Sequence, residues 1–233
     1  MRNLFKNQID TFVSPMFDQS IKDVDKYVLG VELIGAPCRV YREVAAPSDI
    51  YLGYLGELLV LSVGWSGAHL HEIIKGNVSY RRQSEIEKHV DEPDFLQNRY
   101  RDALRHTLGE LLVDKGDSCV LRYDFGDDWI HRVTLIDKLK YDNVSYDEPG
   151  LEILGGEGNC PPDDCGGVEG YIRILDILAD PKDEEYEMVH EWMECWGYGN
   201  FDPHAFNLFE CSRRADDYQR MIDAVRQGFF TRF

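Results

Sequence analysis

The chain has 233 residues, of which 43% are hydrophobic, and its formal net charge is -18 at pH 7. This length and apolar content are enough for a core that folds without disulfide bonds, so we expect the six cysteines to be reduced. No apolar run is long enough to span a membrane, and residues 1–7 lack the apolar stretch of a signal peptide, so we expect a cytoplasmic protein with no membrane partner.

The first half of the chain predicts strands around one helix. We expect residues 1–26, which have mixed polarity, to be an N-terminal arm, and residues 27–34 and 38–44 predict a strand hairpin. An N-cap at Pro47-Ser48-Asp49 and apolar residues at helical spacing predict a helix to Val63. Two further strands follow at 68–75 and 77–81, the first with His69 and His71 on one face.

The middle of the chain predicts a second helix and a second hairpin. Residues 82–98 read as a loop or a short surface helix, and residues 100–112 as a helix. Apolar residues then alternate over 119–125 and 129–135, which indicates two strands joined by a turn at 126–128. In this register Phe125 faces Trp129, Tyr123 faces His131, and His131 lies on the aromatic face.

The last third predicts a long loop followed by helices. The loop spans residues 140–170, and a regular element of unassigned type follows it at 171–178. A helix then begins at Asp180-Pro181, and the last helix covers 214–226. We therefore predict one α+β domain at 27–208, with a largely antiparallel sheet packed against the 50–63 helix. The segment 209–233 is expected to pack on that domain as a C-terminal helix.

The negative charge is concentrated between residues 142 and 202. Seventeen Asp and Glu against two basic residues give this segment a charge of -15. Such a surface repels phosphate groups, so we expect no non-specific nucleic-acid binding. Two interpretations remain open, namely a solvated face and a docking surface for a basic protein partner.

Several separated motifs occur in a specific order. They are Gly64-Trp65, His69-Leu70-His71-Glu72, Tyr123-Asp124-Phe125-Gly126-Asp127-Asp128-Trp129 with His131, Cys160-Pro161-Pro162-Asp163-Asp164-Cys165-Gly166-Gly167, Gly170-Tyr171, and Phe201-Asp202-Pro203 with Phe206. In order and character they resemble the plasmid pRiA4b Orf3-like family, whose members are also labelled passengers of insertion elements. The resemblance covers about residues 27–208 and implies a mixed α+β domain. It implies little about activity, and Asp163 stands where the family is expected to favour glutamate.

The candidate site combines thiols, imidazoles and carboxylates, which are the ligand types of zinc or another divalent metal. The candidate metal ligands are Cys160 and Cys165, and the other candidate site residues are His69, His71, Asp124, Asp127, Asp128, Trp129, His131, Asp163 and Asp164. Each also has a structural interpretation. The Cys-x4-Cys segment then forms a rigid loop with a buried thiol, His131 is a core histidine, the turn aspartates cap the hairpin, and Trp129 belongs to the core.

Two functions are compatible with these observations. The first is a binding or interaction module with an acidic surface. The alternative is a metal-dependent, hydrolase-like enzyme in which the loop carrying Cys160 closes over the histidines.

The charge distribution generates a first prediction. The protein should not bind random duplex DNA appreciably at physiological salt, because its acidic third offers few cations that displace counterions from the phosphates. Retention of an arbitrary duplex at micromolar protein, weakening as salt is added, would contradict this. A localised basic patch would be the exception to examine: Arg81, Arg82, Arg99, Arg101 and Arg105.

Overall fold

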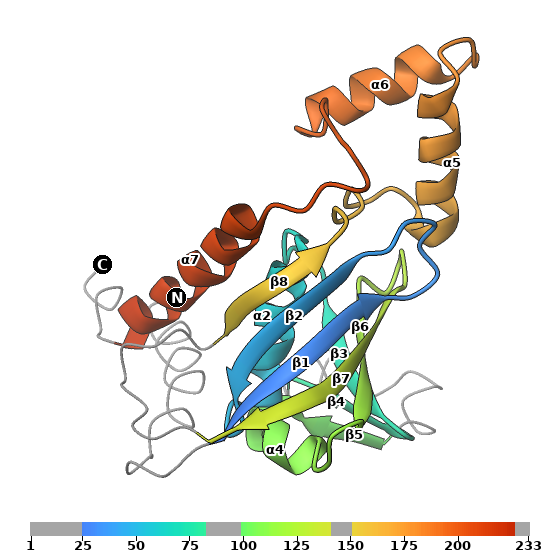
Figure 1. The fold of residues 1–233 in the computed structure, drawn as a ribbon. Coiled ribbons are helices and arrows are strands. Elements are labelled where there is room, and N and C mark those ends of the chain that lie inside the picture. Colours follow the sequence, from blue (N-terminus) through green and yellow to red (C-terminus); the bar gives the residue numbers. More distant parts are fainter. Residues whose placement is uncertain (1–24, 83–98, 141–150, 227–233) are drawn as a thin grey trace, which may run out of the picture.

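An eight-stranded, mostly antiparallel sheet organises the part of the chain that the computed structural model describes, residues 25–82, 99–140 and 151–226 (Figure 1). The strands are β1 (Lys26–Leu33), β2 (Tyr41–Pro47), β3 (His71–Lys75), β4 (Val78–Arg81), β5 (Arg99–Asp102), β6 (Ser118–Tyr123), β7 (Trp129–Leu139) and β8 (Glu152–Glu157). Their order in the sheet is β5-β4-β3-β6-β7-β1-β2-β8. Only the β4–β5 pair of this described sheet is parallel, so the predicted α+β class with a largely antiparallel sheet is confirmed.

One face of the sheet is covered by a buried helix. The helices are α2 (Leu52–Val63), the 3-10 helix η4 (Ala103–Arg105), α4 (Leu108–Leu111), α5 (Gly167–Ala179), α6 (Tyr186–Cys195) and α7 (Leu208–Arg226). Helix α2 packs against β2, β3 and β4, as predicted (Figure 1). It begins at Leu52 rather than directly after the predicted cap, because Tyr51 keeps an extended backbone and pairs with Thr107. A Cβ at Gly56 would lie 2.3 Å from Nε2 of His71, so only glycine permits this close approach to the sheet.

The β6–β7 hairpin supplies the centre of the core. Leu121, Tyr123, Trp129, Val133 and Leu135 are all fully buried. They alternate with more exposed residues along both strands, which places them on the face that α2 covers. The predicted apolar face of this hairpin is therefore confirmed.

The predicted register of the hairpin is wrong by two residues. Tyr123 pairs with Trp129, and Leu121 pairs with His131. The turn contains five residues instead of three, because Asp124 and Asp128 adopt left-handed backbone conformations (φ 54° and 58°) and the Asp128 amide donates to the Asp124 carbonyl. A shift of two residues keeps each side chain on its predicted face. It removes Phe125 from the core, and that ring lies instead against the guanidinium groups of Arg81 and Arg122.

The predicted helix at 100–112 is wrong. This stretch forms β5, η4 and the short α4. Local caps interrupt the helical spacing, since the Asp102 side chain caps η4 and Thr107 with Glu110 forms a capping box that begins α4. The amide of Leu108 donates to the carbonyl of Ile50, so contact with the start of α2 fixes this path.

The predicted loop at 140–170 contains an unpredicted strand. Strand β8 pairs with β2 at the edge of the sheet, and Gly155 and Gly156 within it removed the alternation by which strands are recognised. Helix α5 then begins inside the same predicted loop, at Gly167.

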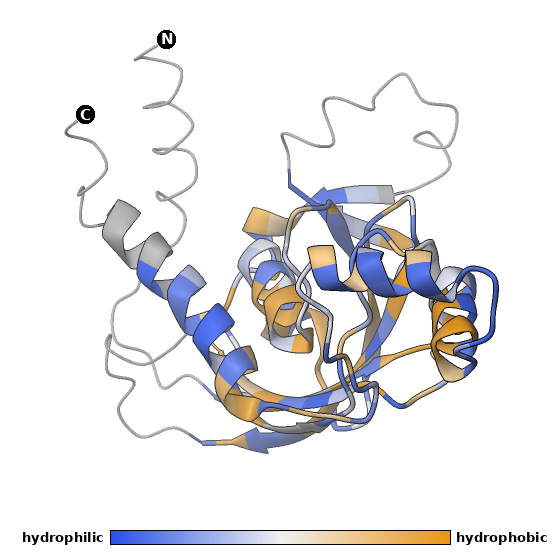
Figure 2. Cartoon of the chain, turned by 90° about the horizontal axis from the view of Figure 1, so that it is seen from above, coloured by the Kyte–Doolittle hydropathy of each residue, from blue (hydrophilic) through white to orange (hydrophobic). Residues whose placement is uncertain are grey.

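The C-terminal helices also differ from their predicted limits. Helix α6 begins at Tyr186, because Asp180 and Asp183 accept backbone hydrogen bonds from Lys182 and Glu185 and form turns first. Helix α7 begins at Leu208 instead of 214 and packs against α2 and β8. Hydrophilic residues dominate the coloured part of α7 after its first turn (Figure 2).

Other predicted segments lie partly or wholly outside the described residues. These are residues 1–24 of the N-terminal arm, residues 83–98, residues 141–150 of the predicted loop at 140–170, and the end of the last segment at 227–233. Within the described ranges, no helix combines the length and the hydropathy that crossing a bilayer requires.

The burial of Trp129 generates a second prediction. Its indole is fully buried, so Trp129→Ala should lower the free energy of unfolding by about 3–5 kcal/mol. Trp196 is 66% exposed and is the matched control, whose replacement by Ala should change that free energy by less than about 0.5 kcal/mol. Denaturant unfolding measures both, and equal small losses would show that Trp129 does not hold the core together.

Candidate functional site

Three segments that are distant in sequence meet at the turn of the β6–β7 hairpin. They are the α2–β3 connection (residues 64–70), the turn itself (124–128) and the β8–α5 connection (158–166). An aromatic cluster lies beneath them. The ring of Trp65 lies 4.8 Å from that of Trp129 and 5.4 Å from that of Tyr123, measured between centroids. This cluster joins the first two segments through their side chains.

Two aspartates attach the β8–α5 connection to the other segments. The carboxylate of Asp163 accepts a hydrogen bond from the Ser66 amide at 3.2 Å, and the Tyr123 hydroxyl donates to its other oxygen at 3.5 Å. The carboxylate of Asp127 accepts from the Gly166 amide at 3.1 Å. Burial raises the pKa of Tyr123 to about 12, so its hydroxyl remains a donor across the physiological pH range. Asp127 and Asp163 therefore act as attachment points for the loop.

The imidazole of His69 lies between two carboxylates. Its Nδ1 is 3.5 Å from Oδ2 of Asp124, and its Nε2 is 3.4 Å from Oδ1 of Asp164. One ligand atom from each of these three residues lies within 4.8 Å of the others. No other His, Cys, Asp or Glu set of three meets this criterion in the described ranges. We call these three residues the His69 triad.

Backbone geometry directs both carboxylates of the triad. Asp124 and Asp164 have φ values of 54° and 57°, which aspartate tolerates better than most residues. Oδ1 of Asp124 accepts from the Gly126 amide at 2.9 Å, which leaves Oδ2 facing His69. Asp124 is buried, His69 is half-buried and Asp164 is exposed. The triad is thus anchored inside and open to solvent on one side.

The two candidate thiols lie outside the triad. Cys160 is buried against Gly64, where a Cβ would stand 2.7 Å from that of Cys160, and burial raises the pKa of its thiol. Cys165 is half-buried, its pKa is raised to about 12 by burial, and its Sγ lies 3.9 Å from the Gly167 carbonyl oxygen. Neither thiol belongs to a set of three close potential ligands among the described residues.

The other two candidate histidines also lie apart from the triad. His71 packs under Gly56 of α2, and burial, reinforced by Arg82, lowers its pKa to about 4. The strand begins only at His71, so His69 precedes it and turns toward the hairpin. The predicted common face for His69 and His71 is wrong for this reason.

His131 is fully buried in the core with both ring nitrogens engaged. Its Nε2 accepts a hydrogen bond from Trp65 Nε1 at 3.1 Å, and because an indole N–H can only donate, the proton of the neutral ring sits on Nδ1. That Nδ1–H donates to the Leu121 carbonyl at 3.2 Å. Burial lowers the pKa of His131 to about 4. The structure thus gives His131 the core interpretation.

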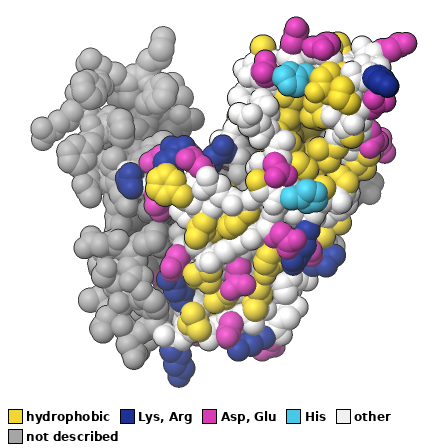
Figure 3. All heavy atoms as spheres, turned by 45° about the horizontal axis from the view of Figure 1, so that its top comes forward, with side chains coloured by type: hydrophobic (Ala, Val, Ile, Leu, Met, Phe, Trp, Pro, Cys, Tyr) yellow, Lys and Arg dark blue, Asp and Glu magenta, His cyan; other side chains and the backbone are white. Residues whose placement is uncertain are grey.

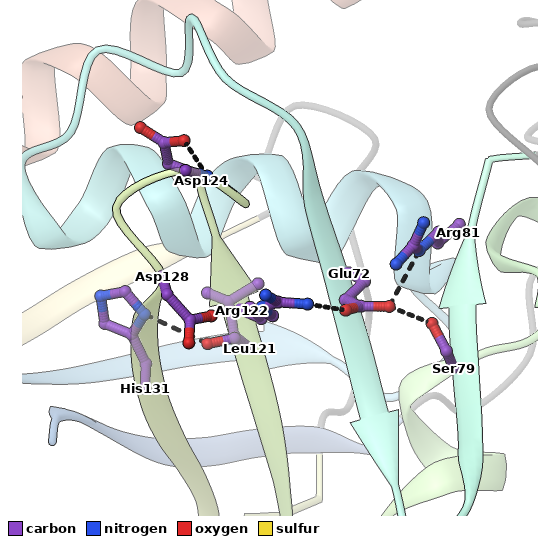
Figure 4. Close-up of polar contacts among 9 residues, drawn as sticks. Glu72, Ser79, Arg81, Leu121, Arg122, Asp124, Asp128 and His131 are labelled. Atoms are coloured by element: carbon purple, nitrogen blue, oxygen red, sulfur yellow. Dashed lines mark hydrogen bonds and ion pairs between the residues drawn. The ribbon is translucent and has the colours of Figure 1, made fainter. Parts of the chain in front are cut away.

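A buried carboxylate that sequence reasoning did not single out lies beside the turn. Glu72 on β3 accepts hydrogen bonds from Ser79, Arg81 and Arg122, and Arg122 also contacts Asp128 (Figure 4). Burial alone would raise the pKa of Glu72, but these hydrogen bonds outweigh it and the net pKa is lowered. Glu72 stands opposite Arg122 on the neighbouring strand, and this pair of opposite charges is the feature by which the network could have been predicted. Asp128 therefore serves this network and not the triad.

Known proteins provide three comparisons. The model of the plasmid pRiA4b ORF-3-like protein family matches residues 25–210. The uncharacterized protein y4hQ of Sinorhizobium fredii is 32% identical over 179 residues, which cover 76% of this chain and 84% of that protein. The crystal structure of a protein of unknown function, MM3350 from Methanosarcina mazei Go1, superposes with a TM-score of 0.65 at 24% identity. It covers 81% of this chain and 98% of the other, so the fold is shared.

The environment of His131 generates a third prediction. Its pKa is about 4 in the folded protein and roughly 6.5 when unfolded, so the unfolded chain binds more protons between these values. Stability should therefore fall as pH drops through this window, by about 2 kcal/mol between about pH 7 and pH 5 from this residue. Denaturant unfolding of His131→Gln at the same pH values isolates the contribution. A variant as acid-sensitive as the parent would show that His131 is protonated without cost in the fold.

Proposed function

The chain belongs to the plasmid pRiA4b ORF-3-like family, a family of unknown function, and from that premise we propose that this member is a binding module that holds a divalent cation in the His69 triad. The observation that carries the proposal is the convergence of one imidazole and two carboxylates from three separate segments. Imidazole nitrogen and carboxylate oxygen are the usual ligands of zinc and of other first-row divalent ions.

Electrostatics supports a cation at this position. No Lys or Arg of the described chain forms an ion pair with Asp124 or Asp164, whose only ionic neighbour there is His69. With a neutral imidazole the triad carries two negative charges, one of them on a buried residue. Binding a divalent ion would neutralise both carboxylates, which offsets the cost of desolvating Asp124.

Binding requires the three ligand groups of the triad to close on the ion. Donor atoms around such an ion lie about 2 Å from it and therefore roughly 3–3.5 Å from one another. One ligand atom from each of the three residues lies within 4.8 Å of the others. The contacts of 3.5 Å and 3.4 Å are made by opposite ring nitrogens of His69, and one ion can use only one of these. Binding through Nδ1, beside Asp124, therefore requires Asp164 to move closer. Asp164 is exposed and can adjust, whereas Asp124 is fixed by the Gly126 amide. Three protein ligands leave coordination positions for water or for a group of a binding partner.

The proposal does not extend to catalysis. The hydrolase-like alternative depended on the loop thiols and on three histidines sharing a cavity. In the structure neither thiol belongs to the triad, and His71 and His131 are engaged under α2 and in the core. Cation binding by the triad needs neither the thiols nor the other two histidines.

Titration with Co²⁺ generates the fourth prediction. We expect one saturable site per chain by calorimetry, with absorption bands of nitrogen and oxygen ligation and without the intense near-ultraviolet bands of thiolate ligation. His69→Gln and Asp164→Asn should each weaken binding by at least about tenfold, because each removes one of three ligands.

Matched controls keep this test specific. His190→Gln and Asp176→Asn remove the same groups from α6 and α5 and should bind Co²⁺ as the parent does. Absence of saturable binding, thiolate bands, or triad variants that bind as tightly as the controls would each overturn the proposal.

A further inference from the structure

The end of α6 carries negative charge where the helix dipole is already negative. Its last turn contains Glu191 and Glu194 and no basic residue. The carbonyl end of a helix has a partial negative charge, so side chains that stabilise it are normally cationic. Both glutamates are exposed, and neither has a Lys or Arg partner among the described residues. The ionic neighbour of Glu194 is the His190 imidazole, whose Nδ1 lies 3.9 Å from Oε1. No Lys or Arg of the described residues therefore offsets the negative charge at this end of α6.

Acidic residues around α6 add to the negative potential at this end of the helix. Between residues 167 and 200 the sequence has nine Asp and Glu against two basic residues, a net charge of -7. One of the two, Arg173, is already paired with Glu185. Acidic and hydrophobic side chains lie side by side over the lobe that α5 and α6 form (Figure 3). A cation near this lobe is attracted from several directions.

An open cavity lies at this helix end. It has a volume of about 410 Å³, and its lining residues are Asn159, Glu194, Gly197, Tyr198, Gly199, Asn200 and Phe201. The rings of Tyr198 and Phe201 are in edge-to-face contact, with centroids 6.2 Å apart, so they form a rigid aromatic wall. Aromatic faces and a carboxylate together are the groups that bind guanidinium and ammonium ions.

An exposed hydrophobic side chain borders the same helix end. Trp196, the residue after α6, is 66% exposed at this end, and Met188, near the start of the helix, is 62% exposed. By contrast, Trp65 and Trp129 are fully buried. Exposed tryptophan is enriched where proteins bind other proteins, because its large ring buries much area with little loss of entropy.

We propose that this end of α6 is a docking site for a basic, partly apolar segment of another protein. An Arg or Lys side chain of that segment enters the cavity between Glu194 and the aromatic wall, and an adjoining apolar side chain packs on Trp196. The net charge of the chain, -18, disfavours both nucleic acid and a second copy of this protein as the occupant. The site shares no residue with the His69 triad and does not require a cation there.

The test uses a fluorescein-labelled peptide of eight alternating Arg and Leu residues and fluorescence anisotropy. We expect saturable binding that weakens at least about tenfold when salt is raised to about 0.5 M. Glu194→Gln and Trp196→Ala should each weaken binding at low salt by at least about fivefold, since they remove the charge partner and the apolar contact. The corresponding Glu–Leu peptide should not bind.

Asp114→Asn is the matched control. Asp114 is exposed, lies in the connection between α4 and β6 and forms no side-chain ion pair in the described chain, so its removal changes the net charge equally. This variant should bind the Arg–Leu peptide as the parent does. If Asp114→Asn and Glu194→Gln weaken peptide binding equally, the peptide is attracted by net charge alone and the proposal is wrong. The absence of saturable binding by the parent would also overturn it.

Discussion

The arrangement of the candidate site depends on the left-handed backbone of Asp124. This conformation starts a five-residue turn, in which one carboxylate oxygen closes the turn by accepting from the Gly126 amide. The other oxygen is thereby turned toward His69. The amide of Asp124 donates to the Leu70 carbonyl, which ties the turn to the segment that carries His69. A single residue thus fixes the turn, the approach of a second segment and the direction of a possible ligand atom.

The core beneath the turn keeps this geometry in place. Trp65, Tyr123 and Trp129 pack as one buried aromatic cluster, and the indole of Trp65 is held by the ring of His131. Because the α2–β3 connection contributes Trp65 to this cluster, the position of His69 four residues later is constrained by apolar packing. The polar attachments made by Asp127 and Asp163 then bring Asp164 to the same place. The triad is therefore rigid on two sides and adjustable only at Asp164.

The sequence predicted the faces of the elements better than their pairing or their ends. Alternation in β6 and β7 identified the buried face because the side-chain period survives a shift of two residues, but it carried no information on the left-handed turn that sets the register. The helix expected at 100–112 failed because contact between Leu108 and Ile50 and local caps overrode the spacing. Strand β8 was missed because two glycines interrupted its pattern.

The candidate site shows the same limit. The sequence identified His69, Asp124 and Asp164 among eleven candidates, but residue type alone favoured Cys160 and Cys165 as metal ligands. Neither thiol belongs to the triad, and Cys160 is buried against Gly64, a contact that no local sequence pattern reports. His131 was correctly placed on the aromatic face, yet its role became clear only from its partner Trp65, 66 residues away.

The central claim is that the His69 triad holds a divalent cation, and anomalous diffraction from crystals soaked in Mn²⁺ tests it most directly. The account predicts a peak about 2.0–2.3 Å from a ring nitrogen of His69 and from carboxylate oxygens of Asp124 and Asp164. A peak confined to other carboxylates or to the thiols of Cys160 and Cys165, or no peak at the triad at saturating metal, would contradict it.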